Sequence, residues 1–298
     1  MHIDGSLRNI SINSQGHMWG TDAKNEIYFR DGIKGSWNKI YCKEYTRFIS
    51  VNEDGNVWNV NPKGKAFIAQ LPNGWTPKVQ DARNPWWYQF EEPSHPPWLE
   101  MAVYATHGDK VFGIQKDTGK VWAQKSNFNR TLWYREKGKN LKEGVLLTNI
   151  SAGKDARIWG TTSKNAVYYK DTNDTGKFSD WVEDKSIKCR QVSATDDGRV
   201  CCNTAENTIY VSDKVGEWTQ LDGWRNIGWV GCARGGDICA TTNKSVIMCR
   251  DREAEIAAAA KIALEEQKRE AAARDAARAA AADKAAAIKA AAVKAAAE

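Results

Sequence analysis

Short apolar runs alternate with polar turns near the N-terminus. Residues 10–12 (ISI) alternate apolar and polar side chains, residues 14–16 (SQG) form a turn signal, and residues 18–20 (MWG) resume the apolar run. A second polar turn precedes residues 27–29 (IYF), and a glycine-containing loop leads to Trp37. Four short segments rich in aromatic and β-branched residues, separated by turns, predict a four-stranded antiparallel sheet.

Diverged copies of this pattern recur until about residue 250, and we align six of them. The aligned positions of the second strand are Trp19, Trp58, Phe112, Trp159, Cys201 and Cys239. The aligned positions of the third strand are Tyr28, Phe67, Trp122, Tyr168 and Tyr210, and the closing positions are Trp37, Trp75, Trp133, Trp181 and Trp218. Successive copies lie 39, 54, 47, 42 and 38 residues apart, a period that fits one propeller blade. The sequence therefore predicts an all-β fold, a six-bladed β-propeller over residues 1–250.

The repeats resemble those of the tectonin family, whose units run as a leucine, an isoleucine-serine strand, a glycine turn, Val-Trp-Gly, Ile-Tyr and a closing tryptophan. The copies at residues 7–37 and 149–181 carry this pattern most plainly, whereas Phe112, Cys201 and Cys239 depart from it. Similar proteins include lectins that bind glycans or lipopolysaccharide, and intracellular proteins whose repeats contact partners or membranes. The resemblance implies a six-bladed propeller and leaves the ligand open.

The last copy lacks a closing strand, and the first residues of the chain look like the end of a unit. The segment Ile3-Asp4-Gly5 resembles Leu221-Asp222-Gly223, which precedes the last copy. We therefore predict that Met1 to Asp4 supplies the missing strand and closes the ring, because a sheet edge would otherwise stay open.

Residues 76–100, between the second and third copies, are an insertion with five of the seven prolines. Proline removes backbone donors, so we expect a long loop without a regular strand. Its aromatic residues are Trp86, Trp87, Tyr88, Phe90 and Trp98. These rings either cover the propeller or form a recognition loop that presents anchors to a partner or stacks on sugars.

From residue 251 the composition changes, because 24 of the last 48 residues are alanine and none is glycine or proline. Alanine has the highest helix propensity, so residues 251–298 predict one long helix. Its few large apolar residues do not keep a heptad repeat, which argues against an independent coiled coil. The helix is either a semi-rigid spacer or a partner-binding element, in which Ile288 and Val293 near the tip would contact the partner.

Charge and cysteine content reduce the number of function classes that fit the sequence. The helical tail holds nine basic and nine acidic residues, so the net charge of +6 lies in the first 250 residues, a bias too small to argue for nucleic acid. Seven cysteines without a regular spacing favour reduced thiols, with Cys201 and Cys239 as small buried apolar groups. Scattered histidines and the absence of a CxxC pair give no catalytic or metal site, and we expect no cofactor and no membrane span.

Asn25, Asn165 and Asn207 recur three residues before the Tyr28, Tyr168 and Tyr210 positions. They could line a repeated ligand site, but asparagine also tolerates the left-handed backbone that tight turns need, and we favour this structural role.

These observations lead to two functional hypotheses. The first is a non-enzymatic scaffold with protein partners, in which the propeller is a rigid platform and the C-terminal helix docks into a larger assembly. We expect it in the cytoplasm, with a cytoskeletal or ciliary assembly as the context. The alternative is a lectin that binds a carbohydrate or lipopolysaccharide at sites repeated around the ring.

Overall fold

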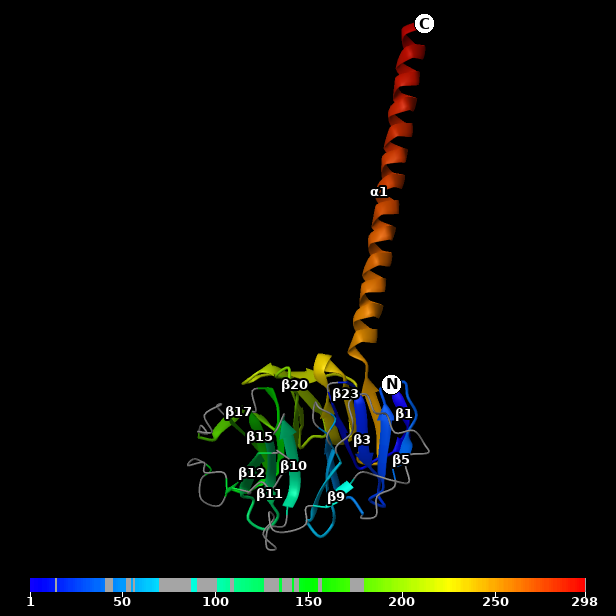
Figure 1. Cartoon of the computed structure of the whole chain (residues 1–298). Helices are drawn as coiled ribbons and strands as arrows, with labels where there is room; N and C mark the ends of the chain where they lie inside the picture. Colours follow the sequence, from blue (N-terminus) through cyan, green and yellow to red (C-terminus); the bar gives the residue numbers. More distant parts are fainter. Residues whose placement is uncertain are drawn as a thin grey trace. The chain divides into compact units, whose positions relative to one another are not determined.

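The structure is a computed structural model of the whole chain. It describes residues 1–297 except 14, 41–44, 52–54, 56, 70–86, 90–100, 108–109, 126–133, 136–140, 142–144, 155–156 and 172–179. The chain forms two compact units, Met1–Asp251 and Arg252–Glu298. Figure 1 shows short strands in the first unit and one long helix in the second.

The strands of the first unit form six four-stranded sheets, which we number in chain order. Sheet 1 consists of β2 (Asn9–Ile12), β3 (His17–Thr21), β4 (Ile27–Asp31) and β5 (Asn38–Ile40). Sheet 2 consists of β6 (Phe48–Val51), β7 (Val57–Val60), β8 (Ala66–Ala69) and β9 (Trp87–Gln89). Sheet 3 consists of β10 (Met101–His107), β11 (Lys110–Gln115), β12 (Val121–Lys125) and β13 (Tyr134–Arg135).

Sheet 4 consists of β14 (Leu147–Ala152), β15 (Ile158–Thr162), β16 (Ala166–Lys170) and β17 (Val182–Lys188). Sheet 5 consists of β18 (Gln191–Ala194), β19 (Val200–Asn203), β20 (Ile209–Lys214) and β21 (Glu217–Leu221). Sheet 6 consists of β22 (Ile227–Cys232), β23 (Ile238–Thr242), β24 (Val246–Arg250) and β1 (His2–Ser6), with the short 3₁₀ helix η3 (Arg234–Gly236) between β22 and β23.

The first strands of the sheets contact one another in a closed ring. β2 contacts β6 and β22, β10 contacts β6 and β14, and β18 contacts β14 and β22. Buried apolar clusters also join each sheet to the next, including sheet 6 to sheet 1. The predicted all-β propeller with a C-terminal helix is confirmed.

The N-terminal strand closes the ring as predicted. β1 pairs antiparallel with β24, His2 opposite Met248 and Ile3 opposite Ile247, and completes sheet 6. The terminal amino group donates to the carbonyl oxygen of Cys249 over 2.7 Å. The strand extends to Ser6, two residues beyond the predicted segment.

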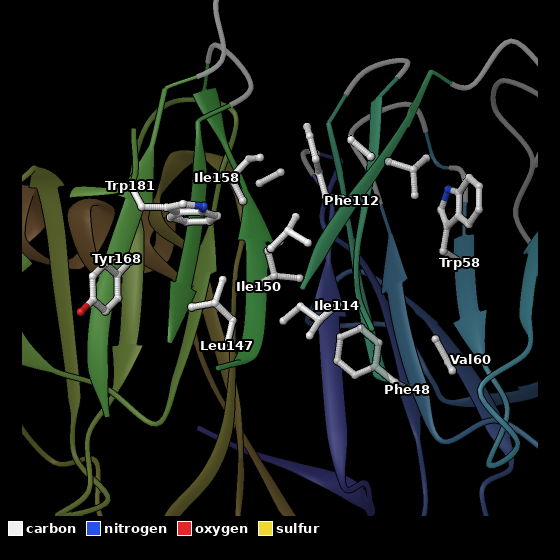
Figure 2. Close-up of a cluster of buried hydrophobic side chains, with 14 residues drawn as sticks. Phe48, Trp58, Val60, Phe112, Ile114, Leu147, Ile150, Ile158, Tyr168 and Trp181 are labelled. Atoms are coloured by element: carbon white, nitrogen blue, oxygen red, sulfur yellow. The ribbon is translucent and has the colours of Figure 1, made fainter. Parts of the chain in front are cut away.

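Aromatic and aliphatic side chains fill the spaces between neighbouring sheets. Figure 2 shows one such cluster, in which side chains of sheets 2, 3 and 4, including Phe48, Phe112 and Ile150, point toward one another. The repeat tryptophans Trp19 and Trp159 are buried in other clusters. They therefore pack between sheets.

In sheets 1 and 4, the glycine that follows the motif tryptophan makes room for the leucine that begins the unit. A Cβ on Gly20 would lie 2.4 Å from Leu7 Cδ1, and a Cβ on Gly160 would lie 2.9 Å from Leu147 Cδ1. The leucine and the glycine of the motif therefore pack directly against each other.

Side chains of the first strands form hydrogen bonds that join one sheet to the next. Ser11, Ser151 and Ser193 accept, through Oγ, bonds of 2.9–3.1 Å from backbone N–H groups of the following sheet. Gln191 accepts from Val230 N–H over 2.9 Å and donates to Val230 C=O over 2.9 Å. These bonds satisfy backbone groups that would otherwise lack partners in the interior.

One prediction about the insertion is wrong. Within residues 76–100, Trp87–Gln89 forms β9, which pairs with β8 with Ile68 opposite Tyr88. No proline lies within these three residues, so the strand keeps its backbone donors. The closing position Trp75 lies outside the described residues.

The expectation of reduced thiols is also wrong for six cysteines. The structure contains the disulfides Cys189–Cys202, Cys201–Cys232 and Cys239–Cys249, and Cys42 lies outside the described residues. Successive side chains of a strand point to opposite faces, so the adjacent Cys201 and Cys202 reach different partners. The bond from Cys201 joins sheets 5 and 6. Sequence spacing could not reveal the Cys201–Cys232 pair, which the packing of two neighbouring sheets brings together.

The second unit is the single helix α1 (Arg252–Ala297) of 46 residues. One surface ion pair joins residues four apart on the helix, since Arg274 Nη2 lies 3.3 Å from Glu270 Oε2. Exposed apolar side chains occur in its first third at Ile256, Ile262 and Leu264. Among the described residues, no helix is long and apolar enough to span a membrane.

Candidate functional site

The residues proposed from sequence as binding anchors are only partly placed. Trp87 and Tyr88 belong to β9, at the outer edge of sheet 2, whereas Trp86, Phe90 and Trp98 lie outside the described residues. Ile288 and Val293 lie in the last turns of α1. The recognition role of these seven residues stays a prediction.

The recurrent turn asparagines have the structural role that we favoured. Asn25, Asn165 and Asn207 have φ angles of 62–64°, in the left-handed region. Their carbonyl oxygens accept hydrogen bonds from Thr46 N–H (2.9 Å), Cys189 N–H (2.8 Å) and Ile227 N–H (3.2 Å), respectively. Each turn is therefore joined to the linker that enters the next sheet.

A cleft of about 640 Å³ lies between sheets 4 and 5, at the end of the strands opposite to these turns. On the side of sheet 4 it is lined by the β14–β15 turn and by Asp171, which follows β16. On the side of sheet 5 it is lined by the β18–β19 turn and by residues 213–215. The edge strands of the two sheets, β17 and β21, contact each other beside it.

Charged side chains of both signs line the cleft, and ion pairs hold Arg157, Asp171 and Asp213 in place. Arg157 Nε lies 2.5 Å from Asp171 Oδ1, and its guanidinium group lies over the Tyr169 ring at 5.5 Å. The equivalent pair in sheet 5 is Arg199–Asp213, with a distance of 2.7 Å from Nε to Oδ1. Both pairs connect the start of the second strand to the residue at the end of the third, so the cleft presents anchored charges of both signs.

Asp197 connects the cleft to the next sheet. Burial would raise the pKa of its carboxyl group, but hydrogen bonds from Thr195 Oγ1 and from the Gly235 and Arg199 N–H groups outweigh this effect, so the pKa lies below its ordinary value. The bond from Gly235 N to Asp197 Oδ2 measures 3.1 Å and joins η3 of sheet 6 to sheet 5. The carboxylate is therefore charged at neutral pH and held in place.

Trp218 forms the outer contact between sheets 4 and 5. Its indole Nε1–H donates to Asp184 Oδ2 over 3.0 Å, and its ring meets Trp159 edge-on at a centroid distance of 6.2 Å. Asp184 also accepts from Ser186 N–H over 3.0 Å. The closing tryptophan of sheet 5 thus fixes the separation of the two sheets beside the cleft.

The arrangement suits the binding of a polar ligand through carboxylate acceptors and guanidinium donors. The described residues contain no cluster of His, Cys, Asp and Glu that could hold a metal ion. The repeat alignment did not single out this site, although the sequence contains a signal for it. His17–Asp31, Arg157–Asp171 and Arg199–Asp213 each lie 14 residues apart, and in each the side-chain nitrogen lies within 3.5 Å of the carboxylate.

A second cavity lies on the ring axis and is small, about 60 Å³. The first strands of sheets 1, 2, 4, 5 and 6 line it, including the hydroxyl groups of Ser11, Ser151 and Ser193. Phe48 of sheet 2 and Trp229 of sheet 6 meet beside it at a centroid distance of 5.5 Å. The cavity has room for a few water molecules and not for a larger ligand.

Solved structures similar to this chain are β-propellers. The β-propeller domain of Myceliophteria thermophila Cps50 (Swd1) matches with a TM-score of 0.53 and 10% identity, covering 82% of this chain and 83% of that chain. Yeast RCC1 (Prp20) bound to Kap60 matches with a TM-score of 0.51 and 10% identity, covering 80% and 68%. Prp20p from Saccharomyces cerevisiae, described with its binding to Gsp1p and histones, gives 0.50 and 10% identity, covering 80% and 70%. At this identity the likeness shows the fold alone.

No curated protein matches the chain. A family model for the Tectonin domain matches residues 1–116, which include all of sheets 1 and 2. The resemblance found in the repeats is confirmed over this part of the chain.

Proposed function

We propose that this protein is a non-enzymatic interaction scaffold. In this proposal, residues 1–250 form a six-bladed ring of tectonin-like blades, which is a rigid platform for protein partners. Residues 251–298 form a helix that docks into a larger assembly.

The observation that carries the proposal is the exposed helix. α1 forms a compact unit of its own and leaves Ile256, Ile262 and Leu264 more than half exposed, at 59%, 61% and 51%. Large apolar side chains on a helix commonly mark contacts with a partner. The ring of bonds between sheets supports the rigidity of the platform.

The experiment compares the full chain with a chain that ends at Asp251, both used as bait in native cells. Quantitative mass spectrometry is expected to find specific partners with the full chain and to lose them with the shortened chain. Tryptophan fluorescence of the shortened chain checks that the propeller is folded, since all fourteen tryptophans precede residue 251. Equal recovery of partners by the two chains would refute docking through the helix.

The cleft between sheets 4 and 5 favours a second candidate function, the binding of a carbohydrate or lipopolysaccharide. The carboxylates of Asp171 and Asp213 and the guanidinium group of Arg157 line the cleft and can bond sugar hydroxyl groups. A glycan array tests this function, with Asp213→Ala as the matched variant. Specific saccharide binding that Asp213→Ala abolishes would favour the lectin function over the scaffold function.

The cytoplasmic location, and the cytoskeletal or ciliary context, remain proposals. The argument from reduced thiols no longer supports them, because disulfides persist mainly in oxidising compartments. Fractionation with a cytoskeletal or ciliary marker would support the proposed location, and recovery in a secretory fraction would contradict it.

A further inference from the structure

Two kinds of loop lie at the same end of the propeller strands. Strands alternate in direction, so the turn between the second and third strands lies at the same end as the linker that enters the next sheet. Hydrogen bonds join the two, as from Leu7 N–H to Ser245 C=O (3.0 Å) and from Thr46 N–H to Asn25 C=O (2.9 Å). We call this end, with its turns and linkers, the turn face.

Lysine occupies the turns of the turn face. Five of the six turns between second and third strands carry an exposed lysine, and Glu206 stands in the turn of sheet 5. The lysines are Lys24, Lys63, Lys116, Lys164 and Lys244. Exposed basic residues of the linkers add Arg8, Arg47 and Arg225, and Lys188 at the end of β17 adds another. These nine basic side chains outnumber the exposed carboxylates of the described turns and linkers of this face, which are Asp117, Glu206 and Asp222.

The two ends of the strands differ in how their basic side chains are paired with carboxylates. At the end opposite to the turn face, Arg157 and Arg199 are neutralised by Asp171 and Asp213. In the part of the chain that the structure describes, Lys24, Lys164 and Lys244 form no ion pair. Two carboxylates lie two residues from Lys24: Asp22 accepts from the backbone N–H groups of Lys24 (2.9 Å) and Glu26 (2.8 Å), and Glu26 pairs with Lys39 over 2.6 Å. The charges of Lys24, Lys164 and Lys244 therefore remain available to an external anion.

Exposed apolar side chains lie beside these lysine turns. Tyr45 is 67% exposed and precedes Thr46, whose N–H is bonded to the turn that contains Lys24. Leu146 is 46% exposed and lies against Gly119, in the turn that begins with Lys116. Val246 is 37% exposed and follows the Lys244 turn. Three of the turns thus combine a cation with an exposed apolar group.

We propose that the turn face binds the surface of an anionic phospholipid membrane. Lysines spread over several turns suit a charged surface, to which each basic group adds attraction. The apolar side chains can enter the interface between headgroups and acyl chains, where tyrosine and leucine are favoured. A nucleic acid would use the same lysines for phosphate contacts but would gain little from Leu146 or Val246. The combination of charge and apolar groups therefore favours the membrane.

The test is co-sedimentation of the full chain with phosphatidylcholine vesicles, with and without an equal part of phosphatidylserine. We expect binding only to the vesicles with phosphatidylserine, weakened by salt. The variant Lys24→Ala/Lys164→Ala/Lys244→Ala should lower the partition coefficient on the order of 100-fold. The matched control Lys34→Ala/Lys261→Ala/Lys268→Ala has the same net charge and should bind like the wild type.

A second variant separates the membrane from other anions. Tyr45→Ser/Leu146→Ser should weaken vesicle binding several-fold and leave its salt dependence unchanged, because it removes apolar and not charged groups. No binding of the wild type to phosphatidylserine vesicles, or an equal loss in the control variant, would overturn the proposal. Binding to a DNA or RNA duplex that exceeds vesicle binding at the same salt, and that Tyr45→Ser/Leu146→Ser does not change, would also overturn it.

Discussion

Gln191→Met tests the bonds that join one sheet of the ring to the next. Gln191 is buried at the start of β18, and its amide group binds both backbone polar groups of Val230 in the neighbouring sheet. Methionine keeps nearly the same length and volume but can neither donate nor accept these bonds. The substitution therefore removes the bonds with little change in packing.

The magnitude follows from the two backbone groups left without a partner. Val230 is 0% exposed, and each unsatisfied buried polar group costs about 1–3 kcal/mol. Both residues also line the small axial cavity, where water can replace part of the lost bonding. We therefore expect the free energy of unfolding to fall by about 2–3 kcal/mol, near the lower end of the combined cost. This corresponds to roughly 5–10 °C in Tm for a unit of this size.

Tryptophan fluorescence during thermal and urea unfolding measures the propeller alone, because α1 contains no tryptophan. Gln220→Met, at an exposed position of β21, is the matched control and should change stability by no more than about 0.5 kcal/mol. A Gln191→Met variant that is as stable as this control would refute the view that side-chain bonds hold neighbouring sheets together.

Four further predictions concern other features of the propeller. Gly20→Ala places a Cβ 2.4 Å from a neighbouring side-chain carbon and should cost about 1–3 kcal/mol in the same assay; an unchanged Tm would contradict the packing role of the motif glycine. Deletion of residues 1–4 should lower Tm by opening sheet 6, and an unchanged value would refute the N-terminal closure. The pKa of Asp197 is lowered, so its carboxylate stabilises the fold above the unfolded pKa, and this stabilisation is lost as pH falls through the folded pKa. Asp197→Asn should therefore lose less stability than the wild type between about pH 5 and pH 2, and equal losses would contradict this role. Alkylation of the unfolded, unreduced protein should leave Cys201 and Cys232 unmodified, and their modification would disprove the disulfide.

Local signals in the sequence were sufficient for most of the fold. Alternating apolar residues and glycine or asparagine turns predicted the strands of sheet 1, and the missing strand of the last copy predicted the pairing of β1 with β24. The left-handed turns at Asn25 and Asn165 followed from the same local chemistry. These features depend on residues close in sequence or on the repeat itself, so the chain alone reveals them.

Features that depend on contacts between copies were not predictable in the same way. The bonds from Gln191 to Val230 and the disulfide from Cys201 to Cys232 join residues that only the packing of neighbouring sheets brings together. The ion pair Arg157–Asp171 has a repeated spacing, but its meaning depends on antiparallel pairing in register. Likewise, the turn face could be recognised only when the turns were known to lie at the same end of the strands.

The most direct test of the central claim, that this propeller acts as an interaction scaffold through its C-terminal helix, is the quantitative recovery of partners. The full chain and the chain ending at Asp251 are compared at equal expression in native cells. The scaffold account predicts specific partners that are lost when the helix is removed, while the propeller stays folded. Equal recovery of the same partners by both chains would contradict it.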